Sequence, residues 1–224
     1  MNPERRLRKR RLLNPRGRKF SRKEIRGRVA REAAMLLYRG AASEFKQAKQ
    51  QAASLLRVKV QPSNFEVALE LDKIADELEG VSRREALVRM RREALHIMRI
   101  LESFNPVLTG SVWRGTARRG SDIDIIVHSS DPDRVVDVLK SSNLNILERR
   151  VETANFLNQM KKFVHVKVGL DSGTEVEVVV RNLDDLGRAE KCDIYGDLMI
   201  GLRIEDLEFL LRHDPLKRFV PKSG

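Results

Sequence analysis

Two aspartates inside an apolar run constrain the fold more than any other feature of the sequence. Asp122 and Asp124 flank Ile123, and Ile125 and further apolar residues follow directly. Side chains two residues apart on a β-strand project from the same face. A strand over residues 122–128 therefore holds the two carboxylates side by side, opposite an apolar face. Carboxylates this close repel each other unless a cation lies between them; a solvent-exposed turn is the alternative setting for such a pair.

A second apolar run contributes another acidic residue. In residues 174–180 the valines alternate with Glu175 and Glu177, so the glutamates share one face of a strand. Glu177 lies deeper in the run, whereas Glu175 is nearer a turn and is expected in solvent. Three carboxylates on neighbouring strands, Glu177 with Asp122 and Asp124, are typical of a two-metal site for phosphoryl or nucleotidyl transfer.

A Gly-Ser pair precedes the aspartates. Gly110 and Ser111 are expected to end a short strand and begin a helix, an arrangement whose free backbone N–H groups bind phosphate. Gly110 and Gly115 have the separation found in a P-loop, but Thr116 and Ala117 stand where Lys and Ser or Thr are required. A Walker-type site is thus excluded, and the Gly-x-Ser-x-Gly elbow of hydrolases is also absent.

Together these motifs carry a family resemblance. Gly110-Ser111, ten intervening residues, Asp122-Ile123-Asp124 and Val176-Glu177-Val178 resemble the signature of the DNA polymerase β-like nucleotidyltransferase superfamily. The stretch from Gly110 to Val127 is especially similar to the minimal nucleotidyltransferases. Within it, Arg114-Gly115-Thr116 is more distantly similar to archaeal CCA-adding enzymes. The resemblance covers residues 107–180, a third of the chain.

The resemblance implies a metal site. Asp122 and Asp124 would ligate two Mg²⁺ ions, with Mn²⁺ as the alternative metal. Glu177 would complete the shell of the catalytic metal and help to activate the acceptor hydroxyl. Many members of the superfamily have Asp at this third position, so Glu177 is a departure from the commoner pattern.

The resemblance also implies a nucleotide site. Gly110 and Ser111 would hold the β- and γ-phosphates of a nucleoside triphosphate, with ATP as the expected nucleotide. Arg114 follows this turn and is assigned to the triphosphate as well. Trp113, beside it, is expected to pack in the core, the commoner setting of an aromatic side chain.

The positive charge of the chain is concentrated at its N-terminus. Residues 1–31 hold 14 Lys and Arg against 2 acidic residues, which equals the whole net charge of +12. Residues 1–20 are expected to form a disordered basic arm that binds a nucleic-acid backbone, RNA above all. A solubilising tail and an organellar targeting segment are the alternatives.

Composition excludes several other classes of protein. One cysteine rules out an internal disulfide framework, and four scattered histidines lack the spacing of a zinc site. No apolar stretch of about 18 residues is present, so we expect no membrane association and a cytoplasmic protein.

The periodicity predicts an α+β fold with a mixed sheet. Ser-x-x-Glu capping boxes at Ser21, Ser63 and Ser82 mark helix starts in an all-helical region, residues 21–104. Alternating strands and helices follow in residues 105–182, the expected catalytic core. A helical C-terminal segment, residues 183–224, completes the chain.

These predictions favour a Mg²⁺-dependent nucleotidyltransferase that transfers NMP from an NTP to a hydroxyl of RNA and releases pyrophosphate. Two alternatives stay open. One is an enzyme that transfers AMP to a partner protein, as in a toxin–antitoxin pair. The other is a non-catalytic RNA-binding protein on a nucleotidyltransferase scaffold.

Overall fold

A computed structural model describes residues 20–221, so the predicted basic arm lies outside the described residues except for Phe20. The chain forms two compact units, Met1–Ile74 and Ala75–Gly224. The sequence suggests a division near residue 104 instead. The units divide earlier because Leu87, Met90 and later apolar residues of the same helix pack in the core beneath the sheet. None of the helices in residues 20–221 is long and apolar enough to cross a membrane.

The first unit is helical. It contains α1 (Arg22–Tyr38), α2 (Phe45–Leu55) and the beginning of α3 (Asn64–Ile100). The predicted capping box at Ser21 is present, because Ser21 Oγ accepts from the Glu24 backbone N–H while the Glu24 carboxylate accepts from that of Ser21. The core of the unit consists largely of alanines, with Val29, Val67 and Ile74, so the helices can approach closely.

Helix α3 is kinked at Gly80, where the backbone has φ 56° and ψ −123°. The predicted capping box at Ser63 is present, with Ser63 and Glu66 bonded reciprocally through side chain and backbone. The predicted box at Ser82 is not formed. Ser82 Oγ instead donates to the Glu79 carbonyl at 2.7 Å, and the helix resumes directly after the kink.

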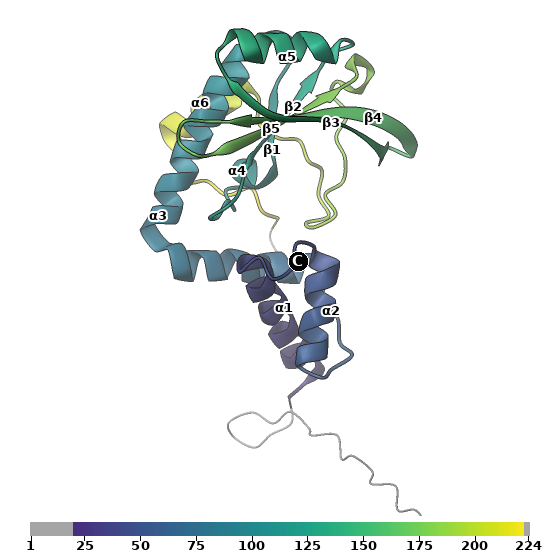
Figure 1. Ribbon diagram of the computed structural model, residues 1–224. Helices are drawn as coiled ribbons and strands as arrows, with labels where there is room; N and C mark the ends of the chain where they lie inside the picture. The colour runs from purple at the N-terminus through teal and green to yellow at the C-terminus, as the bar shows by residue number, and fades with distance from the viewer. Residues whose placement is uncertain (1–19, 222–224) are drawn as a thin grey trace, which may run out of the picture. The chain divides into compact units, whose positions relative to one another are not determined.

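The second unit is built on a five-stranded mixed sheet with the order β1-β2-β5-β4-β3 (Figure 1). Strands β2 and β5 are parallel and every other pair is antiparallel. The elements are β1 (Val107–Thr109), α4 (Gly110–Arg114), β2 (Ile123–His128), α5 (Pro132–Ser141), β3 (Asn145–Phe156), β4 (Gln159–Gly169), β5 (Glu175–Arg181) and α6 (Ile204–His213), with short 3₁₀ turns at Glu102–Phe104 and Leu183–Asp185. The predicted α+β class is confirmed.

The two faces of the sheet differ in chemistry. Ile123 and Ile125 in β2 and the alternate valines of β5 are buried against apolar residues of α3, α5 and α6. The opposite face carries the charged side chains that alternate with them. The apolar alternation thus fixes which face receives the helices, and it leaves the carboxylates of β2 and β5 together on the other face.

Candidate active site

One row of side chains crosses the polar face of the sheet. Thr109, Asp124, Glu177, Lys167 and Glu148 are successive register partners from β1 to β3. Register partners on adjacent strands have Cα atoms about 5 Å apart. Strand pairing therefore places Asp124 directly beside Glu177, as the alternation of the two apolar runs predicts.

Gly110 lies against the Asp124 carboxylate. A Cβ atom placed on Gly110 would be 1.8 Å from Asp124 Oδ2, and the glycine has φ +67°, a conformation that side-chain-bearing residues rarely adopt. Only glycine fits here. Gly110 begins α4 and, because it has no side chain, also leaves the space that the Asp124 carboxylate occupies.

The environment of Asp124 opposes ionisation. Burial, then the negative charge of Asp122 and then that of Glu177, raise the pKa of Asp124 to about 7 from 3.8. Among residues 20–221 the carboxylates of Asp122 and Asp124 have no hydrogen-bond or ion-pair partner. The pair is thus a concentration of negative charge that a bound cation would neutralise.

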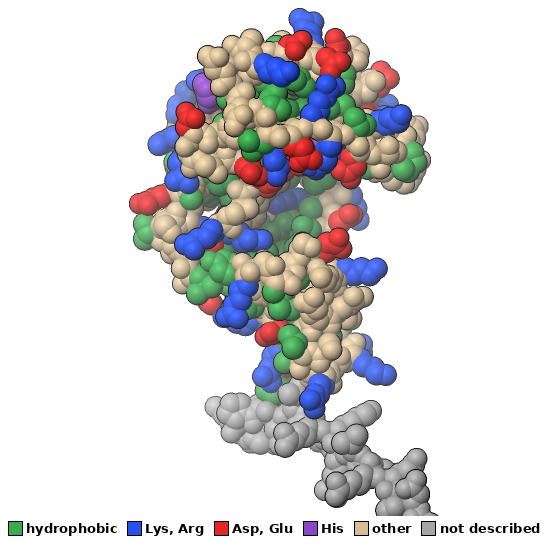
Figure 2. All heavy atoms as spheres, in the orientation of Figure 1, with side chains coloured by type: hydrophobic (Ala, Val, Ile, Leu, Met, Phe, Trp, Pro, Cys, Tyr) green, Lys and Arg blue, Asp and Glu red, His purple; other side chains and the backbone are tan. Residues whose placement is uncertain are grey.

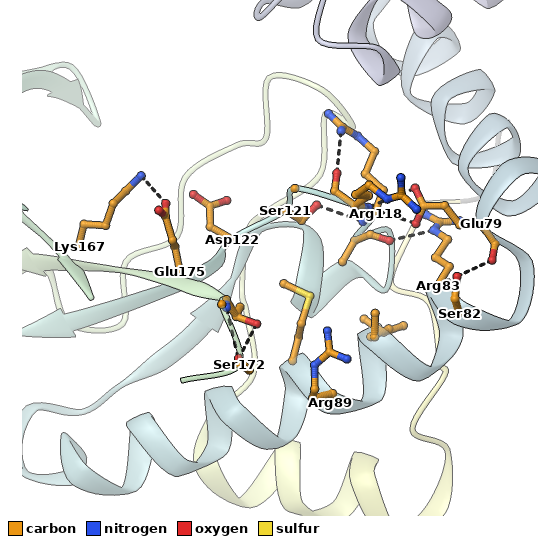
Figure 3. Close-up of a pocket in the computed structure, with 18 residues that line it drawn as sticks. Glu79, Ser82, Arg83, Arg89, Arg118, Ser121, Asp122, Lys167, Ser172 and Glu175 are labelled. Atoms are coloured by element: carbon orange, nitrogen blue, oxygen red, sulfur yellow. Dashed lines mark hydrogen bonds and ion pairs between the residues drawn. The ribbon is translucent and has the colours of Figure 1, made fainter. Parts of the chain in front are cut away.

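Asp122 lies just before β2 and borders a cavity of about 600 Å³. Figure 3 shows Asp122 beside Lys167 and Glu175 at this cavity, with Ser82 and Arg89 across from it on α3. Lys167 donates to Glu175 at 2.8 Å, and this hydrogen bond is the main cause of the raised pKa of Lys167. Glu175 is exposed and paired with Lys167, so Glu177 is the glutamate that lies beside Asp124.

Glu177 is held by two basic side chains. Its Oε1 accepts from Arg150 Nη2 at 2.7 Å and lies 3.2 Å from His165 Nδ1. Within residues 20–221 the structure accordingly contains no group of three or more His, Cys, Asp or Glu side chains arranged to hold a metal ion. The oxygen-only donor set of Asp122 and Asp124 fits Mg²⁺ or Mn²⁺, whereas Oε1 of Glu177 is already engaged by Arg150 and His165.

Comparison with known families agrees with this geometry. Residues 103–189 match the family model described as nucleotidyltransferase domain. This segment is a nucleotidyltransferase domain. It contains the Gly110-Ser111 turn, both aspartates and Glu177, and therefore every motif on which the resemblance rests.

Solved structures of RNA nucleotidyltransferases resemble part of the chain. A cytoplasmic RNA terminal U-transferase is 20% identical with a TM-score of 0.29, and the match covers 53% of this chain and 34% of that one. The Cid1 poly(U) polymerase is 16% identical with a TM-score of 0.30, covering 53% and 36%. The polymerase core of the RNA surveillance complex TRAMP is 20% identical with a TM-score of 0.30, covering 51% and 36%. The chain thus spans about a third of the length of these structures. No curated protein matches its sequence.

The structure does not bring Arg114 to the acidic residues of the nucleotidyltransferase domain. Its buried guanidinium forms a bidentate pair with Asp197 at 2.8 and 3.1 Å and donates to the Phe219 carbonyl at 2.9 Å. It also stacks over Trp113 and Tyr195. Arg114 therefore anchors the C-terminal segment to α4, and this role departs from the predicted contact with the triphosphate. Trp113 is buried as predicted.

Sequence patterns do not single out Arg150 and His165, because these residues lie on the long β3–β4 hairpin. In the structure β3 runs to Phe156 and β4 begins at Gln159. Lys167 was visible only as part of an alternating strand. Charged residues on the solvent face of a strand are ordinary, so their position beside the acidic residues depends on register alone.

Proposed function

We propose that this protein is a Mg²⁺-dependent nucleotidyltransferase that transfers NMP from an NTP, with ATP as the expected nucleotide, to a hydroxyl of RNA and releases pyrophosphate. The observation that supports this most strongly is the carboxylate of the half-buried Asp124, which lies beside Asp122 and Glu177 and has no hydrogen-bond or ion-pair partner among residues 20–221. A nucleotidyltransferase domain with these carboxylates intact has the ligands that its chemistry requires.

Asp122 and Asp124 would hold the divalent cation, and Glu177 would join them when Arg150 releases it. When bound, the cation neutralises phosphate charge and lowers the pKa of a coordinated hydroxyl. Gly110 keeps the Asp124 carboxylate in place because it leaves room for Oδ2. The first backbone N–H groups of α4, at Gly110 and Ser111, have no partner within the helix and would bind the phosphates of the nucleotide.

The transfer step forms one bond and breaks one. The acceptor hydroxyl oxygen attacks the α-phosphorus of the NTP, and the bond from that phosphorus to the bridging oxygen of the β-phosphate breaks. Pyrophosphate leaves with the bonding electron pair. Glu177, nearest to Asp124 on the next strand, would receive the proton of the hydroxyl.

The cavity beside Asp122 offers room for a substrate. Its volume of about 600 Å³ lies within the range of small-ligand sites. Arg118 and Arg119 line it and supply positive charge near the acidic cluster. We assign to this cavity part of the nucleotide or of the acceptor end.

RNA is the proposed acceptor because of the charge of residues 1–31. A chain segment with 14 basic and 2 acidic residues releases many counterions when it binds a nucleic-acid backbone. No corresponding feature favours a protein acceptor, which would require activity independent of residues 1–31.

Mass spectrometry of an RNA oligonucleotide incubated with Mg²⁺ and each NTP in turn tests this proposal. We expect the RNA mass to increase by whole NMP units and pyrophosphate to accumulate in equal amount. Deletion of residues 1–31 should reduce the rate on RNA. If RNA is unmodified with all four NTPs, the proposal of an RNA-directed enzyme is wrong; modification of a co-purified protein instead would support the AMP-transferring alternative.

A further inference from the structure

We propose that the helical first unit binds a nucleic-acid backbone through the α2 surface, defined as the exposed side chains of residues 45–65. The inference concerns binding and assigns a role to a part of the chain outside the nucleotidyltransferase domain. That the bound nucleic acid is the acceptor RNA rests on the proposed function.

The α2 surface contains no acidic residue. From Phe45 to Phe65 the sequence has four basic residues, Lys46, Lys49, Arg57 and Lys59, and neither Asp nor Glu. Beyond residue 31 the chain as a whole has 30 basic and 30 acidic residues. The α2 surface is therefore a local excess of positive charge in a part of the chain that is neutral on average.

The basic side chains of the α2 surface are available for a ligand. Lys46, Arg57 and Lys59 are exposed and Lys49 is half-buried, and none of the four has an ion-pair partner within residues 20–221. Some basic residues elsewhere in the same unit are paired. Arg26 contacts Glu66 at 2.8 Å, and Lys73 contacts Glu70 at 2.7 Å.

The burial pattern of α2 presents polar groups between these charges. Ala48, Ala52 and Ala53 face the alanine-rich core of the unit, so that Gln47 and Gln50 lie on the exposed side. Amide side chains hydrogen-bond to phosphate and sugar oxygens, and such contacts together with Lys and Arg make up most protein contacts to nucleic acids. The composition of the exposed side therefore suits a phosphodiester backbone.

A membrane surface fits the α2 surface less well. Helices that lie on membranes oppose their basic face with large exposed apolar side chains, and Leu55 is the one large apolar residue of α2 that is strongly exposed among those described. Figure 2 shows Lys and Arg side chains spread over the visible face of the helical unit among polar groups, without a broad apolar patch there.

Fluorescence anisotropy of the full chain with a labelled single-stranded RNA of about 20 nucleotides, without NTP, tests this inference. The variant changes Lys46→Gln, Lys49→Gln, Arg57→Gln and Lys59→Gln together. Each basic contact to a single strand contributes about 0.7 to the slope of log K against log salt concentration. We expect the slope to fall by up to about 3 and the affinity at 0.1 M salt to fall at least about tenfold.

A matched control removes the same charge from the second unit. The control changes Arg92→Gln, Arg134→Gln, Lys140→Gln and Lys191→Gln, four exposed residues outside the α2 surface. It should retain most of the affinity and slope. Equal losses in both variants would overturn the inference, because they would show a general effect of net charge.

Further arms separate the ligand classes. DNA of the same sequence shows which part of the nucleic acid is recognised. If the α2 surface binds the phosphate backbone alone, the variant loses equal affinity for DNA and RNA. If it also binds the ribose 2′-hydroxyl, the loss of affinity is larger for RNA. Binding to phosphatidylserine vesicles but not to RNA would overturn the inference, as would wild-type RNA affinity in a folded variant. A Lys46→Glu, Lys49→Glu variant provides a second test if the fourfold change unfolds the protein. Wild-type protein that binds RNA but transfers no NMP would reject the proposed function and leave this inference intact.

Discussion

Asp124 and Glu177 are register partners on the adjacent parallel strands β2 and β5. Both side chains are acidic, so their negative charges repel each other. After burial and the charge of Asp122, the charge of Glu177 is the third cause that raises the pKa of Asp124 to about 7. The acidic residues of the site are thus placed together at a cost in free energy, which a bound cation would offset.

The raised pKa of Asp124 makes stability depend on pH. A carboxyl group whose pKa is higher in the folded than in the unfolded protein stabilises the folded protein at pH values below its unfolded pKa of 3.8. This contribution to stability is lost as the pH rises to the folded pKa of about 7. Asp124→Asn has no charge to bury. It should therefore raise the free energy of unfolding at pH 8 by up to about 4 kcal/mol relative to wild type, with little gain at pH 4.

Urea unfolding of both proteins in EDTA at pH 4 and pH 8 measures this difference. Asp137→Asn, on the exposed side of α5, is the control and should change stability little at either pH. An equal effect of Asp124→Asn at both pH values would show that its carboxylate is not destabilised by its surroundings.

Gly110→Ala should disrupt the site through one steric contact. The new methyl group would overlap Asp124 Oδ2 at 1.8 Å and displace the carboxylate. A misplacement of about 1 Å can reduce activity about 100-fold. Gly196→Ala is the matched control, because Gly196 has φ +76° but open space around its Cβ position and does not line the cavity beside Asp122.

Both glycine variants carry backbone strain of about 1–3 kcal/mol, so thermal unfolding should show similar losses of stability from that cause. Activity and Mg²⁺ affinity should fall strongly only in Gly110→Ala. Equal activity of the two variants would contradict a specific role for the contact with Asp124.

Arg150→Gln should strengthen cation binding. Arg150 holds Glu177 at 2.7 Å, and a half-exposed ion pair of this kind is worth up to about 1 kcal/mol. Releasing Glu177 should therefore raise the affinity for Mg²⁺ or Mn²⁺ about fivefold in isothermal titration. Arg149→Gln removes the neighbouring charge, which pairs with Asp133, and should have no such effect. Weaker cation binding in Arg150→Gln would show that Glu177 does not become a ligand.

Arg91→Lys should destabilise the second unit. The buried guanidinium of Arg91 donates to the carbonyls of Val112, Trp113, Pro215 and Lys217, and burial lowers its pKa to about 10. An ammonium group cannot reach all four, so we expect a loss of about 2–4 kcal/mol. Arg92→Lys, at an exposed position, should change stability by less than about 0.5 kcal/mol. Equal unfolding midpoints of the two variants in urea would contradict this role of Arg91.

The sequence predicted the strands of the site because their side-chain period is two. The alternation around Asp124 and that around Glu177 each identify a strand with one apolar face, and burial of that face leaves the acidic residues on the other. Capping boxes identified the starts of α1 and α3. Local patterns thus revealed the elements and the faces on which the carboxylates lie.

These local patterns do not predict contacts between residues that are far apart in the sequence. The pairing of Arg150 with Glu177 depends on strand register and on the length of the β3–β4 hairpin, which no turn residue marked clearly. Arg114 was assigned to the nucleotide because it follows Gly110 closely, but Asp197, 83 residues further on, binds its guanidinium. Which partner an arginine selects is decided by tertiary packing, which sequence spacing does not encode.

Label transfer from NTPs tests directly whether this protein transfers NMP from an NTP to RNA. Full-length protein is incubated with RNA, Mg²⁺ and an NTP labelled in parallel reactions on the α- or the γ-phosphate. We expect the α-label to become bound to RNA, the γ-label to be released in pyrophosphate, and both events to be lost in Asp124→Asn. Transfer of the γ-label to RNA, no transfer of either label, or full activity of Asp124→Asn would contradict this mechanism.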